Sequence, residues 1–207
     1  MPFTIRAPSE AWTGTLLYSD GQRRVLQIGT IRSSTQGDVV RGVSSEPTRS
    51  VLLPGEVAPD FDLPALIGGV KKRFHLREQL AKTNVVLAFY PVNWESVSAR
   101  QMAEYQEQRE RLRDRAELVA ISVDSIMNTT VWEREIGPLG FALCSDFWPH
   151  GEVSRSYGVF REATPLAGAS ERAVFVVDGK GKIAFSRMYG LLELPSLSEL
   201  LEALRRV

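Results

Sequence analysis

The side chains that could carry chemistry gather at residues 91–98. This stretch holds a carboxylate, Glu95, and a hydroxyl, Ser98, three residues apart. The apolar run before it, residues 85–90, has the length and the β-branched and aromatic content of a strand buried on both faces. A helix-like segment rich in Ala, Gln, Glu and Arg follows, at residues 98–115. Because open α/β sheets bind ligands at such strand-to-helix corners, we expect the functional site here.

Other reactive groups are sparse. Cys144 is the single cysteine, and its apolar surroundings in the sequence favour a small buried hydrophobe over a reactive thiol. Cys144, Asp146 and His150 could be a metal cluster, but their spacing matches no strong zinc motif, so we predict no metal and no cofactor. Pairing of Ser98 with His75 or His150 in a hydrolase is disfavoured, because no Gly-x-Ser-x-Gly elbow surrounds the serine.

The corner carries a recognisable pattern. It reads Phe89-Tyr90-Pro91, then Trp94, then a hydroxyl residue seven positions after the proline. This resembles the active-site loop of peroxiredoxins of the alkyl hydroperoxide reductase and thiol-specific antioxidant family, whose pattern is Pro, three residues, Thr, two residues and the peroxidatic Cys. Pro91 is kept, but Glu95 stands at the Thr position and Ser98 at the Cys position.

Three further segments are similar to the same family. Residues 57–64 resemble its opening Ala-Pro-Asp-Phe-x-Leu segment, and residues 122–125 resemble its strand that ends in Ser-x-Asp. Arg172 precedes an apolar strand and an Asp-Gly turn, as does the arginine that reaches the active cysteine in peroxiredoxins. The resemblance covers roughly residues 53–207 and implies a thioredoxin-like, peroxiredoxin-type fold.

The resemblance implies a thiol-dependent peroxidase, an antioxidant oxidoreductase in which a thiolate attacks one peroxide oxygen and becomes a sulfenic acid. A serine hydroxyl stays protonated and cannot be oxidised in this way, so the chain with Ser98 is predicted to be inactive. We also expect Glu95 to accept a salt bridge from Arg172. Two alternatives stay open: a peroxidase whose catalytic cysteine has been replaced by Ser98 through engineering, or one that uses Cys144, which would need exposure and a nearby cation.

The remaining elements follow from periodicity. Strands alternating with helices, then a closing hairpin and a last helix, predict a three-layer α/β domain at residues 53–207. Residues 1–52 are expected to form an amino-terminal β-hairpin and a linker, because an Asp-Gly pair separates two strand-like runs. The candidate caps for the central helix are Asn93 and Ser96. Helices are also predicted near residues 77–82, 126–136 and 196–206, and strands near residues 118–123, 141–144, 172–178 and 182–188.

Composition limits the partners. Among the 207 residues, 25 Lys and Arg balance 25 Asp and Glu, so no overall field attracts nucleic acid or an anionic membrane. No apolar run approaches a membrane span, and the amino terminus has no signal-peptide core. A single cysteine favours a cytoplasmic protein. By resemblance to the family, we expect a homodimer, with a role in binding another protein if the peroxidatic thiol is absent.

Overall fold

The computed structural model describes residues 15–17, 23–25 and 50–207. Strand β1 (Thr15–Leu17) pairs antiparallel with β2 (Arg23–Val25), in agreement with the predicted amino-terminal hairpin. The turn predicted for that hairpin and the linker up to residue 49 lie outside the described residues. The boundary between residues 52 and 53 stays a prediction.

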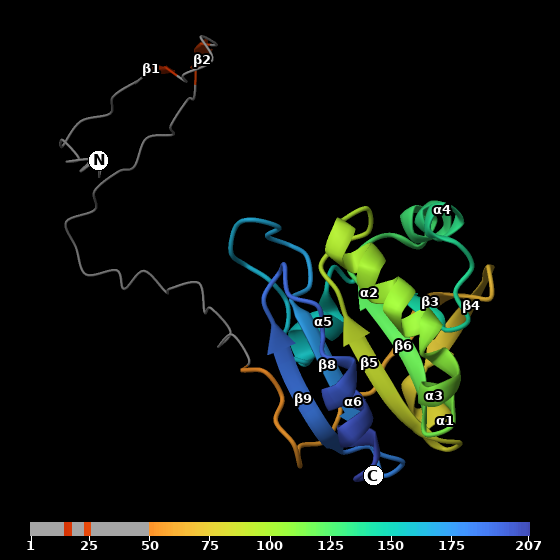
Figure 1. Ribbon diagram of the computed structural model, residues 1–207. Coiled ribbons are helices and arrows are strands. Elements are labelled where there is room, and N and C mark those ends of the chain that lie inside the picture. The colour runs from red at the N-terminus through yellow and green to blue at the C-terminus, as the bar shows by residue number, and fades with distance from the viewer. Residues whose placement is uncertain (1–14, 18–22, 26–49) are drawn as a thin grey trace, which may run out of the picture. The chain divides into compact units, whose positions relative to one another are not determined.

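Residues 50–207 fold around a seven-stranded mixed sheet with the order β4-β3-β7-β6-β5-β8-β9 (Figure 1). Strand β5 pairs parallel with β6 and antiparallel with β8, so it lies inside the sheet. The strands are β3 (Asp62–Ile67), β4 (Val70–His75), β5 (Asn84–Phe89), β6 (Ala116–Ser122), β7 (Ala142–Ser145), β8 (Arg172–Val177) and β9 (Ile183–Tyr189).

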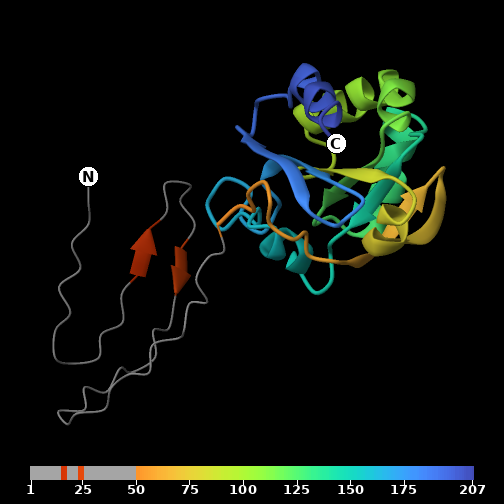
Figure 2. The same ribbon diagram turned by 90° about the horizontal axis from the view of Figure 1, so that it is seen from below.

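Helices cover both faces of this sheet, which gives the three layers that the sequence predicts (Figure 2). In Figure 1, α2, α3 and α6 lie in front of the sheet and α5 lies behind it. Within the described ranges, no helix has the length and apolar character needed to cross a membrane. The helices are α1 (Leu76–Leu80), α2 (Ser96–Glu107), α3 (Arg109–Arg113), α4 (Ile126–Ile136), α5 (Glu152–Ser156) and α6 (Leu197–Leu204).

The continuous apolar sequence of β5 is explained by burial on both faces. Phe89 packs on one side of the sheet, with its ring centroid 5.3 Å from that of Tyr157. The next residue, Tyr90, points to the other side and stacks on Trp132 at 5.7 Å. Because all four rings are buried, the end of β5 is anchored in both halves of the core.

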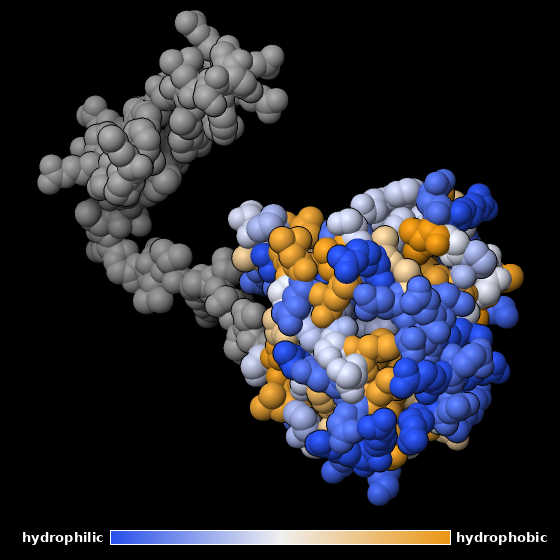
Figure 3. Space-filling view, in the orientation of Figure 1, coloured by the Kyte–Doolittle hydropathy of each residue, from blue (hydrophilic) through white to orange (hydrophobic). Residues whose placement is uncertain are grey.

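The surface of the front helices agrees with their amphipathic sequence. Met102, Tyr105 and Leu112 of α2 and α3 are buried against the sheet, as predicted. The face that these helices turn outward is largely hydrophilic, with separate apolar patches (Figure 3). The dense Glu and Arg residues of this segment therefore belong mainly to a solvated face.

The helix predicted over residues 98–115 is in fact two helices. Gln108 separates α2 from α3, and its backbone (φ −97°, ψ 9°) departs from helical geometry. A loop from elsewhere in the chain binds at this break: Gly140 N donates to Gln106 Oε1 at 2.7 Å, and Arg109 Nε donates to Gly140 O at 2.7 Å. The prediction failed because these contacts, 31 and 34 residues apart in sequence, are not visible in local periodicity.

Two elements of the structure were not predicted from the sequence, and a third lies at different residues from those predicted. Strand β4 is an edge strand whose exposed residues Lys71, Lys72 and Arg73 break the apolar alternation that marks a strand. Helix α5 has five residues, too few to show a helical period. The strand expected over residues 57–64 begins at Asp62 and continues to Ile67, before a turn at Gly68.

Candidate functional site

The corner after β5 is held in place by Asn93. Its backbone N–H donates to Oδ2 of Asp124 at 2.8 Å, and its side chain accepts from the Tyr90 hydroxyl at 2.9 Å and donates to Oγ1 of Thr129 at 3.2 Å. Tyr90 directly follows β5, Asp124 lies just after β6, and Thr129 lies in α4. Pro91, which directly follows this strand end, is buried at the base of the corner.

Glu95 is the N-cap of α2, which corrects the prediction that Asn93 or Ser96 would cap this helix. The Glu95 carboxylate accepts the backbone N–H groups of Val97 at 2.8 Å and Ser98 at 2.7 Å. Asn93 does not serve as the cap, because its side chain is engaged within the corner, and Ser96 is already the first helical residue. The carboxylate therefore satisfies two of the free N–H groups at the helix start.

The predicted salt bridge between Glu95 and Arg172 is present. Arg172 Nη2 lies 2.9 Å from Glu95 Oε2, and the arginine side chain is completely buried. The guanidinium also donates to Gln101 Oε1 at 2.5 Å and to the carbonyl oxygen of Leu191 from Nε at 3.2 Å and from Nη2 at 2.9 Å. An anion and two neutral acceptors thus surround the buried cation.

The charges of this pair are mutually stabilised. Burial by itself would raise the pKa of Glu95, but hydrogen bonds from Val97, Ser98 and Arg172 outweigh it and lower the pKa. Burial lowers the pKa of Arg172, and the contact with Glu95 opposes that change. An arginine keeps its proton in proteins, so both groups are charged at neutral pH.

Ser98 lies inside this cluster and is fully buried. Its hydroxyl donates to Glu95 Oε2 at 2.9 Å. Neither histidine is positioned as its base in the described part of the chain: His75 faces Asp60 and Glu78, and the ring of His150 packs edge-on against Phe147 and Phe160. The hydrolase alternative therefore has no geometric support.

Cys144 does not have the surroundings that a reactive thiol needs. It lies on β7, is completely buried, and pairs with Ala65 of β3 and Ile121 of β6. Burial, and next the neighbouring Asp146 carboxylate, raise the pKa of this thiol. The exposure required for a relocated peroxidatic cysteine is absent, and the expectation of a small buried hydrophobe agrees with this position.

Asp146 has a structural role that explains its sequence neighbourhood. Its carboxylate accepts the backbone N–H groups of Val153 at 3.1 Å and Ser154 at 2.7 Å, and the Ser154 hydroxyl at 2.8 Å. His150, by contrast, is exposed. Within residues 50–207, no group of three His, Cys, Asp or Glu side chains is arranged to hold a metal ion.

The structure thus brings together Glu95, Ser98 and Arg172. Pro91 is buried four residues before Glu95 and takes no part in these contacts. Sequence reasoning missed Gln101 as the second side-chain partner of Arg172. A signal was present: Gln101 lies three residues after Ser98 on a helix, and residues three apart share a helical face.

The mixed sheet, its three layers and the polar corner at a helix start define a thioredoxin-like α/β protein. Residues 54–186 match the family model described as the AhpC/TSA family. The chain belongs to this family, the family of the peroxiredoxins.

Individual relatives agree with this assignment. Alkyl hydroperoxide reductase E of Mycobacterium tuberculosis is 35% identical over 135 residues, which cover 65% of this chain and 84% of the relative. The selenocysteine-containing peroxiredoxin PrxU of Peptoclostridium acidaminophilum is 32% identical over 160 residues and 74% of each chain. The crystal structure of Enterococcus faecalis AhpC superposes with a TM-score of 0.67 at 25% identity, over 74% of this chain and 91% of the other.

Proposed function

We propose that Ser98 occupies the position of the peroxidatic cysteine and that this chain is a peroxiredoxin-family protein without hydroperoxide reductase activity. Peroxide reduction requires a thiolate sulfur to attack one peroxide oxygen, break the O–O bond and expel the other oxygen as hydroxide or alkoxide. A serine oxygen cannot take up this oxidation. The protein then acts through binding and no longer through catalysis.

The contacts of the Glu95 carboxylate carry this proposal. They occupy Ser98 at both its N–H and its hydroxyl, and they pair with Arg172, the residue that the family resemblance assigns to the active cysteine. An arginine neutralised by its own protein is less able to bind a peroxide. The two departures from the family pattern, Glu95 and Ser98, therefore lie in one set of contacts, and both disfavour peroxide reduction.

The first alternative is an active peroxidase whose cysteine has been replaced by Ser98. It predicts that one substitution, Ser98→Cys, restores activity. The second alternative is a peroxidase that uses Cys144, and the burial and raised pKa of that thiol weigh against it. Under our proposal, Ser98→Cys alone stays poorly active because the Glu95 carboxylate would lie against the new thiol.

A peroxide-consumption assay separates these readings. Hydrogen peroxide and an alkyl hydroperoxide are supplied with dithiothreitol as the reductant, and the proteins compared are the wild type, Cys144→Ala, Ser98→Cys, Glu95→Thr and the Glu95→Thr, Ser98→Cys double variant. We expect the wild type and Cys144→Ala to match the rate without protein. The double variant should exceed Ser98→Cys by at least about tenfold, and circular dichroism checks that each variant is folded.

Three results would overturn the proposal. Peroxide consumption by the wild type that is lost in Cys144→Ala would assign the activity to Cys144. Enzymatic turnover by Ser98→Cys alone would support the replaced-cysteine alternative and reject our account of Glu95. Equal peroxide consumption above the background rate by Glu95→Thr and the double variant would show that residue 98 is not the reacting position.

We also propose that the protein forms a homodimer, as expected from the family. Large apolar side chains exposed around the corner support this: Trp94 is 55% exposed, Met127 62% and Trp148 78%. Sedimentation velocity over a range of concentrations should give the mass of a dimer. The Met127→Glu variant should shift the distribution toward the monomer, and a wild type that is monomeric at every concentration would contradict the proposal.

A further inference from the structure

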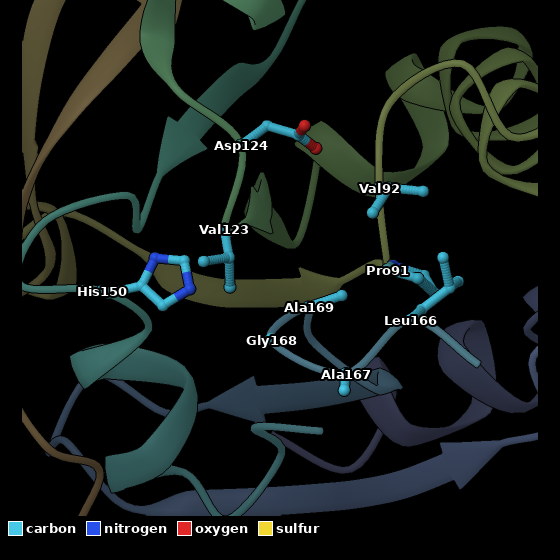
Figure 4. Close-up of a pocket in the computed structure, with 9 residues that line it drawn as sticks. All are labelled: Pro91, Val92, Val123, Asp124, His150, Leu166, Ala167, Gly168 and Ala169. Atoms are coloured by element: carbon cyan, nitrogen blue, oxygen red, sulfur yellow. The ribbon is translucent and has the colours of Figure 1, made fainter. Parts of the chain in front are cut away.

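A pocket of about 280 Å³ opens beside the corner, at the carboxyl ends of β5 and β6 (Figure 4). Among the described residues, its lining includes none of the Glu95–Arg172 cluster, although the pocket shares Pro91 with the corner. This volume suits a fragment-sized molecule. The lining residues are Pro91, Val92, Val123, Asp124, His150, Leu166, Ala167, Gly168 and Ala169.

The wall at residues 166–169 is preformed. Ala169 N donates to Leu166 O at 3.1 Å, and Gly168 N donates to Arg161 O at 2.8 Å. Arg161 in turn donates from Nε to Pro165 O at 2.6 Å. Leu166 has a positive φ of 66°, which is unusual for a residue other than glycine and persists only where the surroundings enforce it.

Asp124 is the one acidic group among the described lining residues, and its position is rigid. Oδ2 accepts the Asn93 N–H at 2.8 Å and the Ser122 hydroxyl at 3.1 Å, and Oδ1 accepts from Asn128 Nδ2 at 3.0 Å. A carboxylate offers about four acceptor positions, so one on Oδ1 is left. All three donors are neutral, and within residues 50–207 no salt bridge joins Asp124 to a cation.

The remaining lining favours one class of ligand. Val92, Val123 and Leu166 offer apolar surface, and no Lys or Arg is among the described lining residues. An anion in this pocket would face the Asp124 carboxylate, and among the described lining residues His150 is the one side chain that could carry a compensating charge. Burial raises the pKa of Asp124, which is the effect expected for a carboxylate that lacks a positive partner.

We propose that this pocket binds a small organic cation, a protonated amine on a short apolar body. The ammonium group donates to Asp124, and the apolar body packs against Val92, Val123 and Leu166. The inference does not depend on the proposed loss of peroxidase activity, because no residue assayed there at positions 95, 98 or 144 lines the pocket.

Benzylamine is a suitable probe. It is titrated into the full ¹⁵N-labelled chain while amide shifts are recorded, with neutral benzyl alcohol and anionic benzoate as isosteric controls. We expect saturable shifts at Val92, Asp124 and Ala169 with benzylamine, at least about tenfold weaker binding of benzyl alcohol, and none of benzoate. Equal binding of the three compounds, or no saturable shifts with benzylamine, would overturn the proposal.

Two variants locate the binding. Asp124→Asn removes the charge and keeps the shape, and Ala167→Leu fills the pocket from an exposed position that is outside the core. Each should weaken benzylamine binding at least about tenfold. If Asp124→Asn also disturbs the corner by weakening the contact with Asn93, the Ala167→Leu variant still tests binding in the pocket independently. Asp114→Asn, an exposed carboxylate after α3, is the matched control and should bind as the wild type does. Unchanged binding in Ala167→Leu would place the ligand elsewhere and reject the pocket.

Discussion

Arg172 and Glu95 are 77 residues apart in sequence, and their side chains meet at 2.9 Å between Nη2 and Oε2. Arg172 begins β8 and Glu95 caps α2, so this ion pair joins the sheet to the corner. The same carboxylate oxygen, Oε2, accepts the Ser98 hydroxyl at 2.9 Å. Glu95 thus contributes to the surroundings of both Ser98 and Arg172.

Removing Glu95 should destabilise the fold through Arg172. Glu95→Ala leaves a buried guanidinium without its anion and the helix without its cap, so we expect a loss of about 3 kcal/mol in the free energy of unfolding. Urea denaturation measures this. Glu107→Ala, at an exposed position on α2, is the matched control and should change stability by less than about 0.5 kcal/mol. Equal effects of the two variants would show that the ion pair contributes nothing.

The contribution of Glu95 should depend on pH in a defined direction. Its pKa in the folded protein is lowered from 4.5, so the ionised group stabilises the fold above that value, and the effect is lost as the pH falls through the folded pKa. The difference in unfolding free energy between the wild type and Glu95→Gln should therefore be similar at about pH 7 and about pH 6, and smaller at about pH 3. A difference that grows on acidification would contradict the sign.

A thiol placed at residue 98 should be a weak acid. The Ser98→Cys sulfur would be buried beside the Glu95 carboxylate, and both effects raise its pKa above the usual value of about 8.5. Adding Glu95→Thr removes the negative charge and should lower the pKa by at least about one unit. The pH dependence of alkylation by iodoacetamide, in a Cys144→Ala background, measures both. Equal pKa values in the two variants would exclude Glu95 as the cause.

Cys144 should be inert in the folded protein. Its burial on β7 and raised pKa predict reaction with a disulfide reagent at least about a hundredfold slower than in a denatured sample of the same chain. Mass spectrometry after exposure to hydrogen peroxide should show no oxidised Cys144. Rapid labelling without denaturant would mean that β7 opens readily and would reopen the alternative in which this cysteine reacts with peroxide.

Local sequence was sufficient for much of the fold. The helix predicted over residues 126–136 has those bounds in α4, with Ser125 capping it, and the apolar run before the corner is the doubly buried β5. The ion pair was expected as well, because the resemblance placed Glu95 beside the arginine of the family. These features succeed because a helical or strand period and a motif spacing are properties of consecutive residues.

Other features depend on contacts that no local pattern contains. Gln108 interrupts the central helix where a loop distant in sequence binds. The Asn93 side chain binds Thr129 within the corner and does not cap the helix. Strand β4 exists because β3 pairs with it, although its charged residues do not resemble a strand. In each case tertiary hydrogen bonds outweigh weak local preferences.

By itself, the amino-acid sequence determined the class of fold, the location of the corner and the absence of sulfur from residue 98. Only the tertiary structure decided between the two alternatives for Cys144 in favour of burial, and showed that Glu95 binds Ser98 and Arg172 through one oxygen and that Asp124 lines a pocket beside the corner. Burial and charge pairing are set by residues distant in sequence that folding brings within about 3 Å, whereas residue identity and period are already present in the unfolded chain.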